Sequence, residues 1–235
     1  MNKIQQIHDI LLKEFGPQHW WPVTENGKLH PEYSDGPKNE KQQLEVIFGA
    51  ILAQSTSWKN VEKAVINLNK NNLIDINKIL MINNEKLAEI IKSSGYHNQK
   101  AKKLKNFCGF LTKSYGGSIK NFFENDIPKL RDELLSVNGI GPETADSIML
   151  YAAKKPIFVV DAYTKRVFNR IGFKESSYDE LQDLFHKSLP NNERLFNEYH
   201  ALIVELGKNT CKKAPLCEEC PVNRHCSHYK NIVKI

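Results

Sequence analysis

Helical periodicity, with almost no alternation at period two, is the feature that most limits the folds open to this chain. Apolar residues recur every three or four positions, as in Ile4, Ile7 and Leu11. The single candidate strand, 157–160, is too short to form a sheet of its own. We therefore expect an all-α protein. Helices are predicted near the N-terminus and at about 44–52, 61–68, 84–93, 98–114, 129–136, 142–154, 162–171, 178–188 and 193–208.

Two breaks in composition divide the chain. Residues 25–40 are polar and contain Gly and Pro, and a second break falls at Lys154-Lys155-Pro156. We predict one helical block at 38–154 and a second formed by 1–37 plus 155–235.

Membrane insertion and export are not expected. The longest apolar run, 46–53, is far shorter than the roughly 18–20 residues that span a bilayer. Asp9 and Glu14 interrupt the apolar pattern of the N-terminus, which is unlike a signal or transit peptide. We expect a cytoplasmic protein with no membrane partner.

The charge balance suits a polyanionic partner without requiring one. The net charge is +6, and lysines cluster at 100–105 and 208–213. Clustered cations bind phosphates with release of counterions. A modestly basic protein can equally be one that is simply soluble, so charge alone leaves both interpretations open.

Cysteines crowd the C-terminus: four of the five lie within the last 25 residues, and Cys108 stands alone. In an intracellular chain this density favours a metal site over disulfides. The residues alone make zinc, in a closed four-thiolate site, the first candidate. The four are Cys211, Cys217, Cys220 and Cys226.

A glycine turn between two helices forms a candidate phosphate site at 127–152. Gly139 ends the first helix, Ile140 is an apolar plug, Gly141 supplies the turn and Pro142 suits the first position of the next helix. Backbone N–H groups and the helix dipole at such a turn can bind phosphate. An ordinary helix connection fits these residues equally well.

Four ordered motifs resemble the endonuclease III superfamily of helix-hairpin-helix DNA glycosylases. They are the hairpin with the Pro-Ile-Phe-Val-Val-Asp segment ending at Asp161, residues 49–56, residues 94–101, and the terminal cysteines. The resemblance implies a two-domain all-α fold of endonuclease III type. It also implies a monomer acting on duplex DNA that contains a damaged base, in the nucleoid of a prokaryotic cell.

Asp161 is the expected N-cap of a helix and, by the resemblance, the catalytic carboxylate. Breaking an N-glycosidic bond leaves positive charge on the sugar. A carboxylate about 4 Å away stabilises that charge by roughly 4 kcal/mol at an effective dielectric of about 20, about a thousandfold in rate. The same group can orient or deprotonate water.

Glu143 occupies the position at which bifunctional relatives carry a Schiff-base lysine. A carboxylate cannot form an imine, so efficient strand cleavage is not expected. Glu143 either provides a favourable charge in the first helical turn or faces the substrate. The adenine-excising branch carries a Glu five residues before the inserted Gln, where this chain has Gly49.

The resemblance also implies which residues contact DNA. Gln54 and Tyr96 are candidates for intercalation and for filling the space of the extruded base, although a lone exposed Tyr is otherwise uninformative. Plain solvation is the alternative for the lysines. The expected set is Gln54, Tyr96, His97, Asn98, Lys100, Gly139, Ile140, Gly141, Lys212 and Lys213.

For the four cysteines the resemblance favours a [4Fe–4S] cluster over zinc, with a structural role. The family's usual first gap is six residues, whereas five separate Cys211 from Cys217. Zinc therefore remains the alternative.

The aromatic residues Trp20, Trp21 and Trp58 resemble the 3-methyladenine/alkylpurine branch. Flat apolar faces replace the stacking that a flipped base loses, and indoles attract cationic methylated purines by about 0.5–2 kcal/mol. Core packing is the alternative for each Trp. We expect a monofunctional alkylpurine glycosylase. A glycosylase for mismatched uracil or thymine, or for oxidised bases, and a non-catalytic DNA-binding module are the alternatives.

Overall fold

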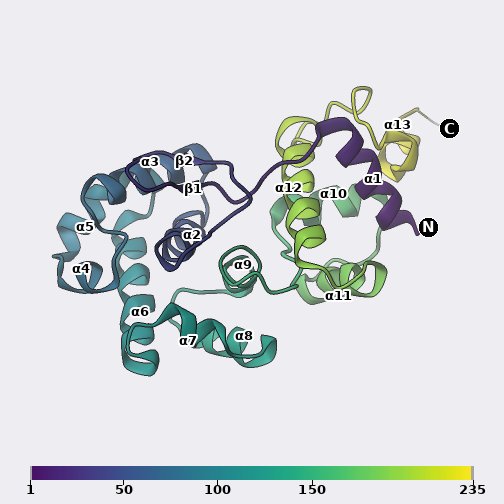
Figure 1. Ribbon diagram of the computed structural model, residues 1–235. Coiled ribbons are helices and arrows are strands. Elements are labelled where there is room, and N and C mark those ends of the chain that lie inside the picture. Colours follow the sequence, from purple (N-terminus) through teal and green to yellow (C-terminus); the bar gives the residue numbers. More distant parts are fainter. Residues whose placement is uncertain (1, 234–235) are drawn as a thin grey trace. The chain divides into compact units, whose positions relative to one another are not determined.

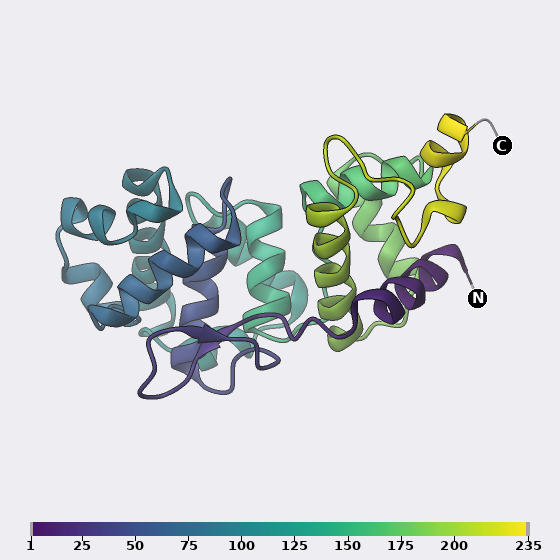
Figure 2. The same cartoon turned by 90° about the horizontal axis from the view of Figure 1, so that it is seen from above.

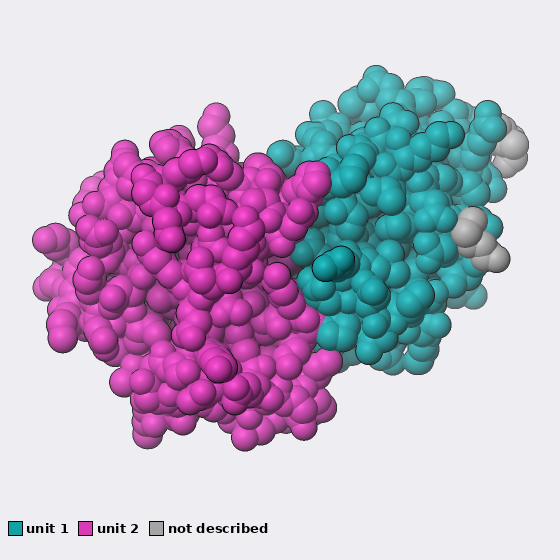
Figure 3. All heavy atoms as spheres, in the orientation of Figure 1, with its two compact units in different colours: residues 1–18, 156–235 teal, residues 19–155 magenta. Residues whose placement is uncertain are grey.

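The computed structural model describes residues 2–233, which are mostly helical. The chain divides into two compact units (Figure 3). The central unit comprises residues 19–155, and the terminal unit comprises residues 1–18 with 156–235. No helix within residues 2–233 has the length and apolar character needed to cross a bilayer.

The central unit is built around α2, Glu40–Leu52, whose residues from Leu44 to Leu52 are all buried. The helix packs against α3, α6 and the π-helical turn η2 (Figure 1). In chain order the other elements are β1 (Val23–Thr24), β2 (Pro31–Glu32), α3 (Trp58–Lys70), α4 (Ile76–Met81), α5 (Asn84–Ile90), η1 (Lys92–Ser94), α6 (His97–Tyr115), α7 (Ile119–Phe123), α8 (Ile127–Ser136), α9 (Pro142–Ser147) and η2 (Ile148–Ala152).

The terminal unit packs α12, Glu193–Asn209, against α1 and α10 (Figure 2). Its core is aromatic: Phe158 and Phe185 stack with ring centroids 3.6 Å apart. The Tyr199 hydroxyl donates to the Ile4 carbonyl at 2.8 Å and so ties α1 to α12. The elements are α1 (Lys3–Phe15), α10 (Ala162–Ile171), α11 (Tyr178–Ser188), α12, η3 (Asn223–His225) and α13 (Ser227–Val233).

The segment 19–37 differs from expectation, since it belongs to the central unit and not to the terminal block. The reason is packing. Trp21 lies against Gly49 of α2, and the backbone N–H of Thr24 donates to Glu45 of the same helix. This segment also forms the β1–β2 pair, with Val23 opposite Glu32, whereas 157–160 is not a strand.

Candidate functional site

The hairpin at 137–141 joins α8 to α9 as predicted from its glycines. Gly139 adopts a left-handed φ of 97°, and Gly141 is the N-cap of α9. Ile140 is buried, as expected of a plug, and its N–H donates to the Val137 carbonyl. The two helices are joined by an ion pair in which Arg131 of α8 donates twice to the fully buried Asp146 of α9, at 2.8 and 3.2 Å.

Gln54, in the loop after α2, contacts this hairpin. Its amide nitrogen donates to the Gly139 carbonyl at 3.0 Å and to the Thr144 hydroxyl at 2.9 Å. Its amide oxygen accepts from Lys103 of α6. Gln54 and the hairpin, which were predicted as separate DNA-contacting elements, therefore form one hydrogen-bonded group within the central unit.

Tyr96 lies at the start of α6 and is the N-cap residue, with a left-handed φ of 47°. Its side chain is 67% exposed, which leaves the ring accessible for stacking. Of its neighbours, Asn98 is exposed and His97 is half-buried.

Lys100 does not lie on the surface expected of a residue that contacts DNA. Its side chain is buried, and its ammonium donates to the carbonyls of Leu52 and Ser94 at 2.8 and 2.6 Å. Burial, with a contribution from nearby Lys103, lowers its pKa to about 8. Lys100 thus ties the end of α2, next to Gln54, to the loop that carries Tyr96, so any effect on DNA binding would be indirect.

The aromatic residues form one cluster in the central unit. Trp20 and Trp21 each pack against Trp58, with ring centroids 4.9 and 5.1 Å apart. Trp21 is buried against Gly49 and Tyr151, so core packing accounts for it. Trp20 and Trp58 are half-buried. Tyr33, which belongs to no predicted motif, is exposed, and its ring centroid lies 5.7 Å from that of Trp20.

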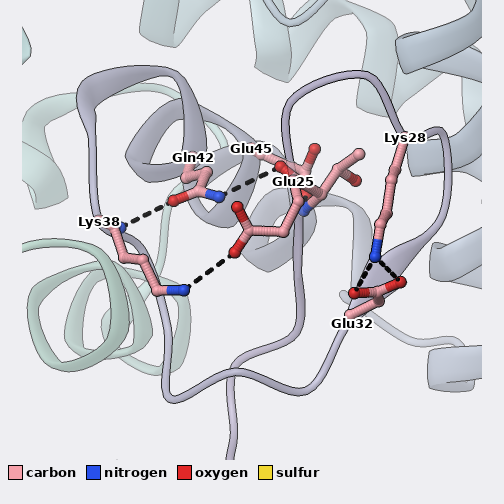
Figure 4. Close-up of polar contacts among 7 residues, drawn as sticks. Glu25, Lys28, Glu32, Lys38, Gln42 and Glu45 are labelled. Carbon is pink, nitrogen blue, oxygen red and sulfur yellow. Dashed lines mark hydrogen bonds and ion pairs between the residues drawn. The ribbon is translucent and has the colours of Figure 1, made fainter.

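A polar network holds the segment that carries Trp20, Trp21 and Tyr33 (Figure 4). Buried Glu45 accepts from the Thr24 N–H at 2.7 Å and from Asn69 at 2.8 Å. Gln42 donates to the Thr24 carbonyl and accepts from the Lys38 N–H. Burial raises the pKa of Glu45 in spite of these hydrogen bonds. The backbone of the loop is therefore attached to α2 through the side chains of Glu45 and Gln42.

Asp161, in the terminal unit, is the N-cap of α10 as predicted. One carboxylate oxygen accepts from the Thr164 N–H at 2.7 Å and from its hydroxyl at 2.9 Å. The other lies 3.7 Å from Nε2 of His200 on α12. The side chain is 13% exposed. Burial opposes ionisation, but the His200 interaction and the Thr164 hydrogen bonds outweigh it and lower the pKa. The carboxylate is therefore largely shielded from solvent, yet its ionised form is favoured.

The four terminal cysteines line one cavity, together with Arg170 of α10. The guanidinium of Arg170 donates to Cys211 Sγ at 3.4 Å and to the carbonyls of Lys212 and Lys213. Arg166 donates to the Cys211 carbonyl at 2.9 Å. Within residues 2–233, however, no group of three or more His, Cys, Asp or Glu side chains is arranged to hold a metal ion.

Three further predicted residues are exposed. Lys212 and Lys213 have exposed side chains, because Arg170 binds only their carbonyls. Glu143 is an exposed residue of the first turn of α9. The sequence did not single out His200, Lys103 or Tyr33 as candidate site residues. His200 contacts Asp161 and Lys103 contacts Gln54. Both contacts join residues far apart in the sequence, so no local motif reveals them.

The fold and the hairpin define a helix-hairpin-helix protein, and similarity to known proteins identifies the family. Residues 48–191 match the HhH-GPD superfamily of base excision DNA repair proteins. A Methanocaldococcus jannaschii protein named "Putative DNA repair glycosylase" is 44% identical over 95% of each chain. Endonuclease III of Thermotoga maritima is 31% identical over 83% of this chain and 88% of its own. This chain belongs to the HhH-GPD superfamily of DNA repair glycosylases, which confirms the predicted superfamily.

Solved structures share the fold. The H. pylori 3-methyladenine DNA glycosylase bound to 1,N6-ethenoadenine superposes with a TM-score of 0.68 at 29% identity, covering 88% of this chain and 98% of its own. An endonuclease III–DNA complex reaches a TM-score of 0.78 at 24% identity, covering all of both chains. The second likeness concerns the fold alone.

Proposed function

We propose that this protein is a monofunctional glycosylase that releases alkylated purines from duplex DNA. The observation that carries the lesion class is the aromatic cluster, in which half-buried Trp20 and Trp58 rest on buried Trp21. Rigid indole faces suit a flat purine, and they attract one made cationic by methylation. The similarity to a 3-methyladenine glycosylase that binds an ethenoadenine supports the same lesion class.

Asp161 supplies the chemistry. Hydrogen bonds from Thr164 and the proximity of His200 favour its ionised form. In a site with little water, the fixed negative charge stabilises the positive charge that develops on the sugar as the base leaves. A purine alkylated at N3 or N7 is already a good leaving group, so this site needs no separate general acid.

Glu143 supports hydrolysis without strand cleavage. It lies in the first turn of α9, where the resemblance assigns a Schiff-base lysine to bifunctional relatives. The carboxylate cannot form an imine, so the abasic product keeps an intact backbone. Borohydride reduction during the reaction tests this point: no covalent protein–DNA adduct should form, and an adduct would identify a lyase lysine elsewhere in the chain.

Contacts to DNA are proposed for exposed residues in each of the two units. Tyr96 intercalates, while Asn98 and the lysine pair Lys212 and Lys213 bind phosphates. The hairpin from Gly139 to Gly141 holds the backbone through its amides. These contacts are independent of sequence, as a repair enzyme that scans for damage requires.

A [4Fe–4S] cluster is the proposed occupant of the cavity lined by the four cysteines. Zinc, which four thiolates can hold in a closed tetrahedral site, is the alternative occupant. The gathering of all four cysteines at one cavity, with the resemblance to a family that ends in a similar run of cysteines, favours the cluster. When bound, it would staple the C-terminal loop to α10. Iron and zinc analysis with the visible spectrum separates the two: brown protein with about four irons supports the cluster.

A panel of duplex oligonucleotides tests the substrate class. One strand carries 3-methyladenine, 7-methylguanine or ethenoadenine, and matched duplexes carry mismatched uracil, mismatched thymine or an oxidised base. Release of alkylated purines, with strand breaks only after alkali, supports the proposal. Cleavage without alkali would show lyase activity, and release only of uracil, thymine or oxidised bases would favour that alternative substrate. No release from any duplex would favour a non-catalytic DNA-binding module.

A further inference from the structure

Lys103 lies across the hairpin turn. The alkyl chain of this α6 residue covers Gly139: a Cβ added at Gly139 would lie only 2.5 Å from Cγ of Lys103 and 2.9 Å from its Cδ. Gly139 also has a left-handed φ of 97°, so a side chain there would be strained as well as crowded. The hairpin therefore has a glycine at the point where Lys103 crosses it.

The ammonium of Lys103 contacts the side chain of Gln54. It donates to the amide oxygen of Gln54, whose nitrogen donates to the Gly139 carbonyl and the Thr144 hydroxyl. Both ends of the amide are thus engaged, by α6 on one side and by the hairpin and α9 on the other. The Lys103 contact also fixes which end of the amide faces the hairpin.

A polar pocket of about 140 Å³ opens beside this group. Its lining includes Gln54 and Lys103 and also the exposed Tyr96. Gln54 and Lys103 are half-buried, so their polar ends can be reached from this pocket. The hydrogen-bonded group thus borders the surface on which DNA is proposed to bind.

We propose that Lys103 is a positioning residue for Gln54, which it holds together with the hairpin in the arrangement that receives duplex DNA. The proposal rests on the proposed binding of damaged duplex DNA and on the intercalation that the family resemblance implies for Gln54. A charged donor that fixes the amide before DNA arrives removes part of the entropy cost of ordering this side chain on binding. Lys103 then acts through Gln54 and not as one more phosphate-binding lysine.

A double-mutant cycle on a duplex with an abasic-site analogue tests this, because the analogue needs no base release and no knowledge of the lesion. K103M keeps the alkyl packing on Gly139 but removes the donor. Lys102, exposed on the same helix, supplies the matched control K102M with the same change in charge. We expect K103M to bind about tenfold more weakly than wild type and K102M to change affinity by less.

Coupling to Gln54 is the decisive result. If Lys103 acts through Gln54, the Q54A/K103M double variant binds no more weakly than the weaker single variant, and K103R, which keeps a charged donor, recovers most of the affinity. The proposal would be overturned if the fold-losses of affinity in Q54A and K103M multiplied in the double variant. It would also be overturned if K103M lost no more affinity than K102M. If circular dichroism shows that K103M is misfolded, K103Q takes its place in the same cycle. Failure of the proposed function would instead appear as absent base release, with this binding pattern unaffected.

Discussion

Asp161 Oδ2 and His200 Nε2 lie 3.7 Å apart in the terminal unit, joining the N-terminus of α10 to α12. Together with the Thr164 hydrogen bonds, this proximity lowers the pKa of the carboxyl although burial acts in the opposite direction. His200 is therefore a residue that keeps the proposed catalytic group ionised, and its contribution is open to measurement.

Base release by the wild type should keep its rate down to pH values below the ordinary Asp pKa of 3.8, because the pKa of Asp161 is lowered. In H200N the loss of the imidazole leaves burial less opposed, so the pKa of Asp161 rises and the acidic limb of the rate profile moves to higher pH. Single-turnover rates, corrected for spontaneous depurination, measure this shift. An unmoved acidic limb would mean that His200 does not influence Asp161.

The same pKa shift affects stability. A carboxyl whose pKa is lowered on folding stabilises the native state above its unfolded pKa, and this contribution is lost as pH falls through the folded value. H200N should therefore be less stable than the wild type at neutral pH, and this difference in the free energy of unfolding should shrink as the pH falls through the folded pKa of Asp161 in the wild type. Acid titrations followed by circular dichroism provide the check.

A side chain at Gly49 is expected to crowd the aromatic cluster, because a Cβ there would lie 3.0 Å from Cζ2 of Trp21. G49A should lower the free energy of unfolding by about 1 kcal/mol, because the crowding outweighs the usual gain of a helical Gly→Ala change, and should alter tryptophan fluorescence. Gly109 in α6 is the control, since nothing lies within 4 Å of its added Cβ. G109A should stabilise by roughly 0.5–1 kcal/mol. Equal responses at the two positions would contradict the packing of Trp21 on α2.

The Arg131–Asp146 ion pair, which joins the two helices of the hairpin, should contribute strongly to the free energy of unfolding. R131M leaves the fully buried Asp146 without its bidentate partner, which costs about 3 kcal/mol. Urea unfolding measures the loss. The exposed Lys129 of α8 provides a control of the same charge, and K129M should change stability by less than about 0.5 kcal/mol.

Arg170 should govern retention of the proposed cluster, because its guanidinium donates to Cys211 Sγ and to the carbonyls of Lys212 and Lys213. R170L is expected to be purified with less iron per chain and to lose its visible absorbance faster in air. R194L changes an exposed arginine of α12 and is the matched control. Identical iron content in the two variants would show that Arg170 does not support the metal site.

The sequence predicted those elements whose ends carry local signals. The helix 162–171 was placed correctly because Asp161 caps it and Gly172 ends it in a left-handed conformation. The helix 178–188 likewise begins with a capping box formed by Ser177 and Glu180. Helices α4 and α7, with six and five residues, are too short to show a periodic pattern.

What sequence could not supply depends on tertiary contacts. Lys100 is a lysine in a basic cluster, and only the fold shows that its ammonium binds two carbonyls away from solvent. The sequence assigns segment 19–37 to the terminal block, and only the contacts of Trp21 and Thr24 with α2 show that it belongs to the central unit. The contact of Gln54 with the hairpin spans 85 residues of sequence.

Asp161 carries the central claim, and D161N tests it most directly on whichever alkylated duplex the wild type processes. The substitution keeps the shape of the side chain and removes its charge. The account predicts that the single-turnover rate of base release falls by about a thousandfold, while affinity for a duplex with an abasic-site analogue stays within a few fold of wild type. Base release by D161N at the wild-type rate would contradict it.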